Sequence, residues 1–130
     1  MRRRLAALGL ATILLVAASG AAHADAEAPP SIPEIITIAA REQGADAQVL
    51  LAVATCESVL DPYAVGDHGN SLGLFQLHRF GLRSDFYQWA TERYGYADVW
   101  DPYMQASYAA AMIAQGYGYH WTCYRRLMWG

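Results

Sequence analysis

A single glutamate offers the clearest acid chemistry in this sequence. Glu57 lies at the end of a predicted apolar helix, on the same face as Leu50, Val53 and Ala54. Burying an ionised carboxylate on that face is costly, so burial would raise the pKa of Glu57 and keep it protonated near neutral pH. A general acid needs such a proton. The same position also fits an exposed residue at a frayed helix end, and both interpretations remain open at this point.

Aromatic residues are confined to the second part of the chain. All 16 (four Trp, nine Tyr and three Phe) lie between Tyr63 and Trp129. Tyrosine combines a flat apolar face with a hydroxyl, which suits sugar rings as well as protein contacts. Most of these side chains must fill the core of a small domain. The better candidates for ligand contacts are the tyrosines that flank glycines in predicted loops: Tyr94, Tyr96, Tyr117 and Tyr119.

Other chemical patterns are weaker. Four aspartates are candidate second carboxylates, although each also fits a turn or a helix cap: Asp61, Asp67, Asp85 and Asp101. His68 and His78 flank a glycine-rich stretch without a third ligand nearby, so we predict no metal site. The sequence also contains neither a Gly-x-Ser-x-Gly nucleophile motif nor a phosphate-binding glycine loop.

The helices that would position Glu57 are indicated by their caps. Ser31 and Glu34 match a capping box, apolar residues recur at helical spacing after them, and Gly44 suits the end of this helix. Asp46 is a good N-cap for a second helix that runs to Glu57. An Asp-Pro pair shortly afterwards marks a turn and ends the helical pattern.

The remainder of the chain predicts a mainly α fold. Residues 63–78 are rich in glycine and polar residues, which indicates an irregular loop or a small β-hairpin. Gly116 and Gly118 are expected to end one of the later helices. Helical patterns return over three further ranges: 85–94, 101–113 and 119–129. We therefore predict mainly α structure, with a small hairpin or loop insertion after the helix that carries Glu57.

Composition and charge exclude several classes of protein. Residues 1–24 have the features of a signal peptide: three arginines, an uncharged apolar run and a small-residue cleavage site. The alternative is a retained membrane anchor. Without these residues the chain has six arginines, twelve acidic residues and no lysine, a net charge of −6. Such a domain is a poor partner for nucleic acid or anionic lipid. We expect residues 25–30 to be a flexible lead-in and residues 31–130 to form one domain.

Two cysteines, Cys56 and Cys123, lie in the part predicted to be exported. In an oxidising compartment the simplest interpretation is one disulfide that closes the intervening residues into a loop. Two free buried thiols are the alternative. Two isolated cysteines lack the spacing of a metal site.

Several segments together resemble a known family. Residues 57–65 read Glu-Ser-Val-Leu-Asp-Pro-Tyr-Ala-Val, and residues 71–77 read Ser-Leu-Gly-Leu-Phe-Gln-Leu. With Trp100-Asp101-Pro102 and Trp121, they resemble the catalytic core of the soluble lytic transglycosylase (SLT) domain family, in the lysozyme-like superfamily. The resemblance extends from about residue 32 to residue 123. It implies a lysozyme-like α+β fold.

The resemblance also implies an activity. The family cleaves peptidoglycan glycan strands between N-acetylmuramic acid (MurNAc) and N-acetylglucosamine (GlcNAc), without hydrolysis and without a cofactor, and forms 1,6-anhydromuramyl products. By match, Glu57 is similar to the sole catalytic acid/base. Ser58 is similar to an adjacent hydroxyl that orients the acid or the substrate.

Further candidate contacts with substrate follow from the same resemblance. The Gly-Leu-Met-Gln-type motif of the family forms a wall of the substrate cleft. It is matched here by Gly73, Leu74, Phe75 and Gln76. In this match Gln76 would hydrogen-bond sugar and Gly73 would permit close approach. Met112 occupies the expected position of a family tyrosine, for which Tyr108 or Tyr117 is a candidate replacement.

Three functions fit these patterns. The favoured one is a secreted or envelope-associated lytic transglycosylase that acts as a monomer on peptidoglycan, away from the membrane once the signal peptide is cleaved. The second is a lysozyme-type hydrolase of the same bond, in which Asp67 or Asp85 would position water. The third is a wall-binding module without catalytic activity.

Overall fold

The computed structural model of the chain describes Leu15, Gly20 and residues 26–130. The predicted signal peptide, residues 1–24, lies outside the described residues apart from those two isolated positions. Residues 26–30 form neither helix nor strand, and regular structure begins at Ile32. No helix in the described ranges is long and apolar enough to cross a membrane.

The first helix, α1 (Ile32–Gln43), is bounded by the predicted signals. The Ser31 hydroxyl accepts the Glu34 N–H at 3.4 Å, and the Glu34 carboxylate accepts the Ser31 N–H at 2.7 Å. This reciprocal pair is the predicted capping box. Gly44 follows the helix with a φ of 73°, a left-handed conformation that glycine adopts without steric cost.

The second helix, α2 (Ala47–Ser58), carries Glu57 close to its C-terminal end. Its start is capped as predicted, because the Asp46 carboxylate accepts the N–H groups of the second and third helical residues at 2.8 and 3.1 Å. Its end is unusual. Val59 and Leu60 have φ values of 56° and 61°, which cost about 1–3 kcal/mol each in residues other than glycine. The chain therefore turns sharply directly after the Glu57-Ser58 pair.

The predicted insertion after α2 is a three-stranded antiparallel sheet. Its strands are β1 (Val65–Gly66), β2 (Ser71–Leu72) and β3 (Leu77–His78), in that order across the sheet. In this register, Leu72 lies between Val65 and Leu77. A short 3₁₀ helix, η1 (Asp67–Gly69), connects the first two strands.

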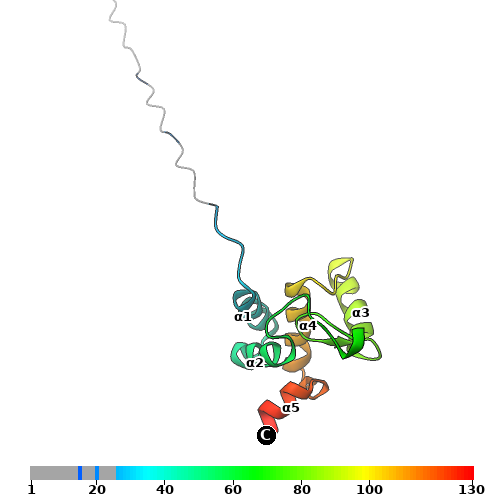
Figure 1. The fold of residues 1–130 in the computed structure, drawn as a ribbon. Coiled ribbons are helices and arrows are strands. Elements are labelled where there is room, and N and C mark those ends of the chain that lie inside the picture. Colours follow the sequence, from blue (N-terminus) through cyan, green and yellow to red (C-terminus); the bar gives the residue numbers. More distant parts are fainter. Residues whose placement is uncertain (1–14, 16–19, 21–25) are drawn as a thin grey trace, which may run out of the picture.

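Helix α4 (Pro102–Ala114) is the centre of the fold. Residues 104–111 are all buried, and many of them are small, so neighbouring helices can approach closely. Figure 1 shows α4 between the α1–α2 pair and α3 (Leu82–Tyr94). The start of α3 lies three residues before the predicted one, because Gly81 precedes it without a capping side chain that the sequence could reveal.

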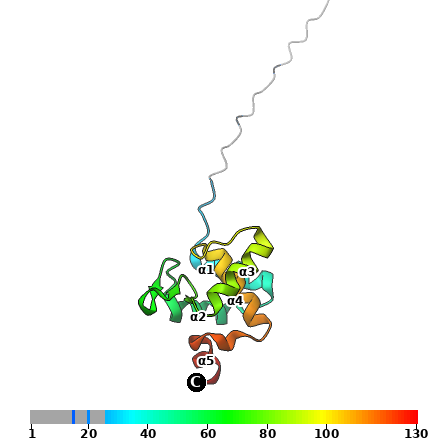
Figure 2. The same ribbon diagram turned by 90° about the vertical axis from the view of Figure 1, so that its right-hand side faces the viewer.

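The chain ends with a 3₁₀ turn, η2 (Gly118–His120), and helix α5 (Thr122–Trp129). Both views place α5 at one end of the molecule, away from α1 and α3 (Figures 1 and 2). The expectation that Gly118 ends a helix is wrong, because α4 already ends at Ala114. Gly118 is needed for packing instead, since a Cβ there would lie 2.6 Å from the Tyr124 ring.

The predicted disulfide between Cys56 and Cys123 is present, with the two Cα atoms 5.9 Å apart. It joins the last turn of α2 to the first turn of α5. Cys56 directly precedes Glu57 on α2, and Cys123 lies in the first turn of α5, whose backbone contacts Glu57.

Removal of this disulfide should destabilise the fold. We expect Cys56→Ala combined with Cys123→Ala to lower the free energy of unfolding by about 3–4 kcal/mol, because the unfolded chain regains the freedom of the loop that the bond closes. Urea denaturation of the oxidised wild type and of the double variant measures the difference. An equal urea midpoint for the two proteins would contradict a stabilising role.

Candidate active site

The carboxyl group of Glu57 is half-buried between α2 and the start of α5. One of its oxygens, Oε1, accepts the backbone N–H of Cys123 at 3.3 Å. Burial raises the pKa of Glu57 above its ordinary value, and the Cys123 N–H and the cations of Arg126 and Arg125 oppose this rise in part. Of the two interpretations that the sequence left open, the structure therefore favours the sheltered acid.

A polar cavity of about 330 Å³ lies beside Glu57. Its walls come from the end of α2, the small sheet, the start of α3 and the segment before α5. The residues that give it polar and aromatic character are Glu57, Asp67, Gln76, His78, His120 and Trp121. A sheltered carboxyl group and an open cavity thus occur together, which is the arrangement that acid catalysis on a bound molecule needs.

A second cavity, of about 490 Å³, extends this space between α3 and the end of α4. Leu82 and His120 line both cavities, so the two cavities adjoin each other. Trp89 and Tyr117 supply aromatic faces to the second part, and Met112, at the position of the family tyrosine, also lines it. We refer to the two cavities together as the groove.

Asp67 and His78 form a pair on the side of the groove made by the sheet. His78 Nε2 lies 2.9 Å from Asp67 Oδ2, and His78 Nδ1 accepts the Phe80 N–H at 3.2 Å. In a neutral imidazole this pattern assigns the proton to Nε2, which donates to Asp67. Asp67 has a left-handed backbone, with a φ of 50°, and such strain is concentrated at functional sites.

Gln76 is the one member of the matched Gly-Leu-Phe-Gln segment whose side chain lines the groove. Leu74 and Phe75 are fully buried, so they support the wall from behind. The Gln76 amide Nε2 donates to the carbonyls of Ala64 and Gly73 at 3.2 and 3.0 Å. These two bonds fix the Gln76 side chain at the groove.

The close approach that Gly73 permits is to a protein side chain. With a φ of 79°, Gly73 would place a Cβ only 1.9 Å from Gln105 Nε2. Gln105 is fully buried on α4, and its Oε1 accepts the Phe75 N–H at 2.9 Å. Because Gly73 has no side chain, Gln105 of α4 can approach closely and hydrogen-bond the loop of residues 73–75.

The side chains of Ser58 and Tyr108 also make hydrogen bonds to other groups of the protein. The Ser58 hydroxyl is 2.7 Å from the carbonyl oxygen of Leu74, which ties the end of α2 to the groove wall. The Tyr108 ring is fully buried, and its hydroxyl donates to Asp85 Oδ2 at 2.7 Å. Burial and the Asp85 carboxylate raise the pKa of Tyr108 well above its usual range, so this hydroxyl stays protonated. Of the two candidate tyrosines, only Tyr117 lies at the groove.

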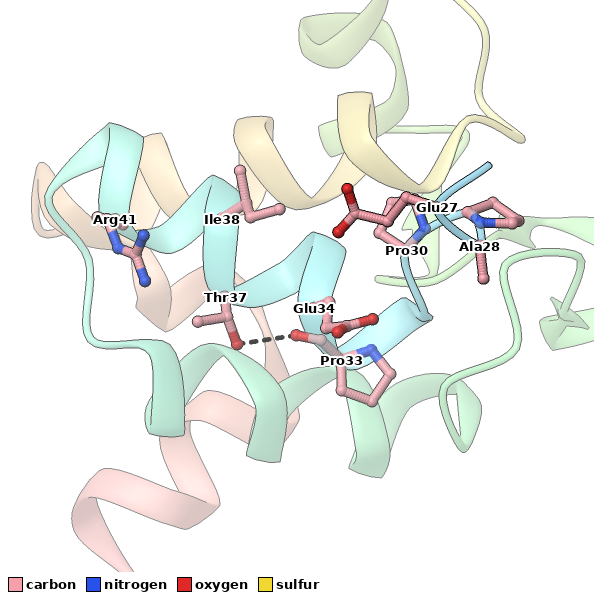
Figure 3. A pocket seen from close by; sticks show the side chains of 9 residues that line it. Glu27, Ala28, Pro30, Pro33, Glu34, Thr37, Ile38 and Arg41 are labelled. Atoms are coloured by element: carbon pink, nitrogen blue, oxygen red, sulfur yellow. Dashed lines mark hydrogen bonds between the residues drawn. The ribbon is translucent and has the colours of Figure 1, made fainter. Parts of the chain in front are cut away.

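A hollow larger than either of these two cavities lies elsewhere in the described chain. It measures about 670 Å³ and lies between residues 27–30 and α1 (Figure 3). Two of its polar side chains already make hydrogen bonds within α1 or at its start, since Glu34 caps the helix and the Thr37 hydroxyl donates to the Pro33 carbonyl at 2.8 Å. It lies away from Glu57 and does not bring together groups suited to chemistry.

Two features around the groove were not predicted from the sequence. His120 follows Gly116 and Gly118, and no motif indicates that its turn folds back to Glu57. Trp121, which belongs to the family resemblance, lines the same cavity. Gln105 was not among the predicted site residues, and only the structure shows its bonds to the loop of residues 72–75. No group of three or more metal-ligating side chains occurs among residues that the structure describes.

The fold and the groove define a lysozyme-like α+β domain with one sheltered carboxyl group. The model of the family described as "Transglycosylase SLT domain" matches residues 34–124, and the chain belongs to this family. Peptidoglycan lytic transglycosylation is the activity associated with the family. Neither the curated proteins nor the solved structures gave a match to the chain.

The raised pKa of Glu57 predicts how stability depends on pH. Above 4.5, its ordinary pKa, the folded state holds this proton more tightly than the unfolded state, so stability falls as pH rises through the folded pKa. Glu57→Gln removes the charge and keeps Oε1 as an acceptor. We expect its thermal midpoint to exceed that of the wild type at about pH 7, and the gain to disappear well below 4.5.

A matched control is Glu92→Gln, which removes the same charge from an exposed position on α3. Its thermal midpoint should stay close to that of the wild type at every pH. Differential scanning calorimetry across the pH range measures all three proteins. A Glu57→Gln midpoint at or below that of the wild type at about pH 7 would contradict a sheltered acid.

Proposed function

We propose that this chain is an extracytoplasmic lytic transglycosylase that cleaves peptidoglycan with Glu57 as its sole acid/base. The observation that carries the proposal is the half-buried Glu57 carboxyl group, whose burial-raised pKa favours the protonated form and which opens onto a groove. Membership of the SLT family makes peptidoglycan the substrate to test.

The proposed reaction moves one proton to and from Glu57. Glu57 protonates the glycosidic oxygen between MurNAc and GlcNAc, and the bond from that oxygen to the anomeric carbon breaks through an oxocarbenium-like state. The C6 hydroxyl of the same MurNAc attacks the anomeric carbon and returns its proton to the Glu57 carboxylate. The product is a 1,6-anhydromuramyl end, and the carboxyl group is ready for the next cycle. Because the nucleophile is internal to the sugar, no second carboxylate is required.

The glycan strand is proposed to follow the groove past Glu57. Gln76 would hydrogen-bond sugar hydroxyl or acetamido groups, while Trp89 and Tyr117 offer flat faces for sugar rings. Ser58, Gly73, Leu74, Phe75 and Tyr108 are assigned a supporting role, in which they hold the wall and the floor of the groove.

Export completes the proposal. Residues 1–24 are proposed to be a cleaved signal peptide, followed by a lead-in at 25–30 and the SLT domain at 31–130, which works as a monomer. The Cys56–Cys123 disulfide supports an oxidising compartment, since such bonds rarely persist in the cytosol.

A hydrolase is the second candidate, and one observation favours it. Asp67 lines the same cavity as Glu57, and His78 engages only its Oδ2 atom. The Oδ1 atom accepts no side-chain or backbone hydrogen bond from the residues described, so it could hold a water molecule against a sugar. In that case the products would carry reducing ends in place of anhydro ends.

Product analysis tests the first function against the second. Purified peptidoglycan is digested with wild type, Glu57→Gln and the control Glu92→Gln, and the soluble fragments are analysed by mass spectrometry. We expect 1,6-anhydromuramyl ends from the wild type and from Glu92→Gln. We expect at least about a 100-fold lower rate from Glu57→Gln, because general acid catalysis contributes a factor of that order.

The remaining outcomes are equally informative. Reducing ends that disappear in Asp67→Asn would establish the hydrolase in place of the transglycosylase. Wild-type protein that sediments with peptidoglycan but releases no soluble fragment would overturn both enzymatic functions and support a wall-binding module.

A further inference from the structure

Helix α5 presents its N-terminus to the Glu57 carboxyl group. The first N–H groups of a helix have no partners within the helix, and α5 has no capping side chain of its own. The N–H of Cys123, the second helical residue, instead donates to Glu57 Oε1 at 3.3 Å. Glu57, near the end of α2, thus serves as a cap for α5.

The packing of α5 against the remainder of the domain is sparse. Cys123 is its single buried residue, whereas Leu127, Met128 and Trp129 are 49%, 49% and 68% exposed. Figure 2 shows α5 at the end of the molecule, where its neighbours are α2 and η2. Two contacts therefore determine where the Cys123 amide lies: the disulfide from Cys123 to Cys56, and the buried Trp121 directly before α5, whose indole donates to the Phe75 carbonyl.

The groups around Glu57 divide by element. From α5 come the Cys123 N–H and the cations of Arg125 and Arg126, all of which favour the ionised carboxylate. From the other walls of the cavity come Asp67 on η1, His78 on β3 and His120 on η2. Helix α5 is thus the element that stabilises the carboxylate which Glu57 becomes when it gives up its proton.

We propose that the backbone amide of Cys123 is a positioning group for Glu57, and that the Cys56–Cys123 disulfide holds it in place, so that glycan cleavage depends on the oxidation of this bond. The inference rests on the proposed function of Glu57 as the acid. When Glu57 protonates the glycosidic oxygen, the amide hydrogen bond fixes the orientation of the carboxylate until the proton returns.

The disulfide is open to a reductant, because Cys56 is exposed. A thiolate of a dithiol, such as an extracytoplasmic thiol–disulfide oxidoreductase, would attack one sulfur and release the other as a thiolate. The second thiol of the dithiol then attacks the mixed disulfide and releases the protein cysteine as a thiolate. Two electrons and two protons pass from the dithiol to the cysteines, and α5 loses its covalent link to α2.

Two variants remove the disulfide, one with the Cys123 amide and one without it, and are compared with the oxidised wild type. Cys56→Ala with Cys123→Ala removes the bond and keeps the amide, whereas Cys56→Ala with Cys123→Pro removes both. Proline suits this position, the second of the helix, because Pro33 occupies the same position in α1. The pKa of Glu57 in each variant is measured by ¹³C NMR titration of its carboxyl carbon.

We expect a higher Glu57 pKa in the proline variant than in the oxidised wild type, since the donor that favours the carboxylate is gone. The alanine variant, whose amide is no longer held by the disulfide, should have a pKa between the two or equal to that of the proline variant. Cleavage requires protonated Glu57, so the pH at which the rate declines on the alkaline side should move upward as well. Equal pKa values in the proline variant and the oxidised wild type would overturn the role of the amide. A purely structural role would change stability without separating these pKa values.

Reduction of the wild type supplies a readout that requires no proline. Dithiothreitol should accelerate hydrogen exchange at the Cys123 amide about fivefold or more and lower the cleavage rate about tenfold. The alanine double variant, which has no bond to reduce, should not respond. Unchanged exchange and rate in the reduced wild type would overturn the role of the disulfide.

These readouts separate the inference from the function on which it rests. The pKa values and the amide exchange report on Glu57 and α5 whether or not peptidoglycan is cleaved. Wild-type protein without cleavage activity, together with separated pKa values, would refute the proposed function alone. Active wild type with equal pKa values would refute the positioning amide alone.

Discussion

The Glu57 carboxyl group lies where the C-terminal end of α2 meets the N-terminal end of α5. Two opposing influences act on its pKa: burial raises it, and groups of α5 lower it. Burial near the end of α2 favours the protonated form of Glu57, while the Cys123 amide and two arginines of α5 favour the ionised form. A general acid must pass between both forms in each cycle, so neither influence can dominate. The disulfide links these two helix ends covalently, and the left-handed turn at Val59 and Leu60 ends α2 directly after Ser58.

Three hydrogen bonds attach the groove wall at Leu74 and Phe75 to the helical part of the domain. Ser58 binds the loop from α2, Gln105 binds it from α4, and the Trp121 indole donates to the Phe75 carbonyl at 2.9 Å. All three bonds are buried, where breaking them is costly. The acid and the wall are therefore held as one rigid unit, and Gln76 faces the groove in a preorganised position. Preorganisation of this kind reduces the entropy that binding and catalysis would otherwise lose.

Local signals predicted much of this arrangement. The capping box at Ser31, the Asp46 cap and the apolar face that shelters Glu57 all act within a few residues along the chain, so they can be recognised in the sequence. The features that escaped prediction depend on distant contacts or on strained backbone. Asp67, whose backbone is left-handed, meets His78 from the 3₁₀ helix η1, and Gln105 meets the loop about thirty residues away. Helix α3 begins without a capping side chain, so its start carried no signal.

The central claim is that residue 57 donates a proton to a glycosidic oxygen held in the groove. The most direct measurement is a crystal structure of Glu57→Gln with a peptidoglycan tetrasaccharide bound. The account predicts that the oxygen between MurNAc and GlcNAc lies within about 3 Å of the side chain at position 57, with the strand extending past Gln76. A saccharide bound only in the hollow beside α1, or with that oxygen beyond reach of residue 57, would contradict it.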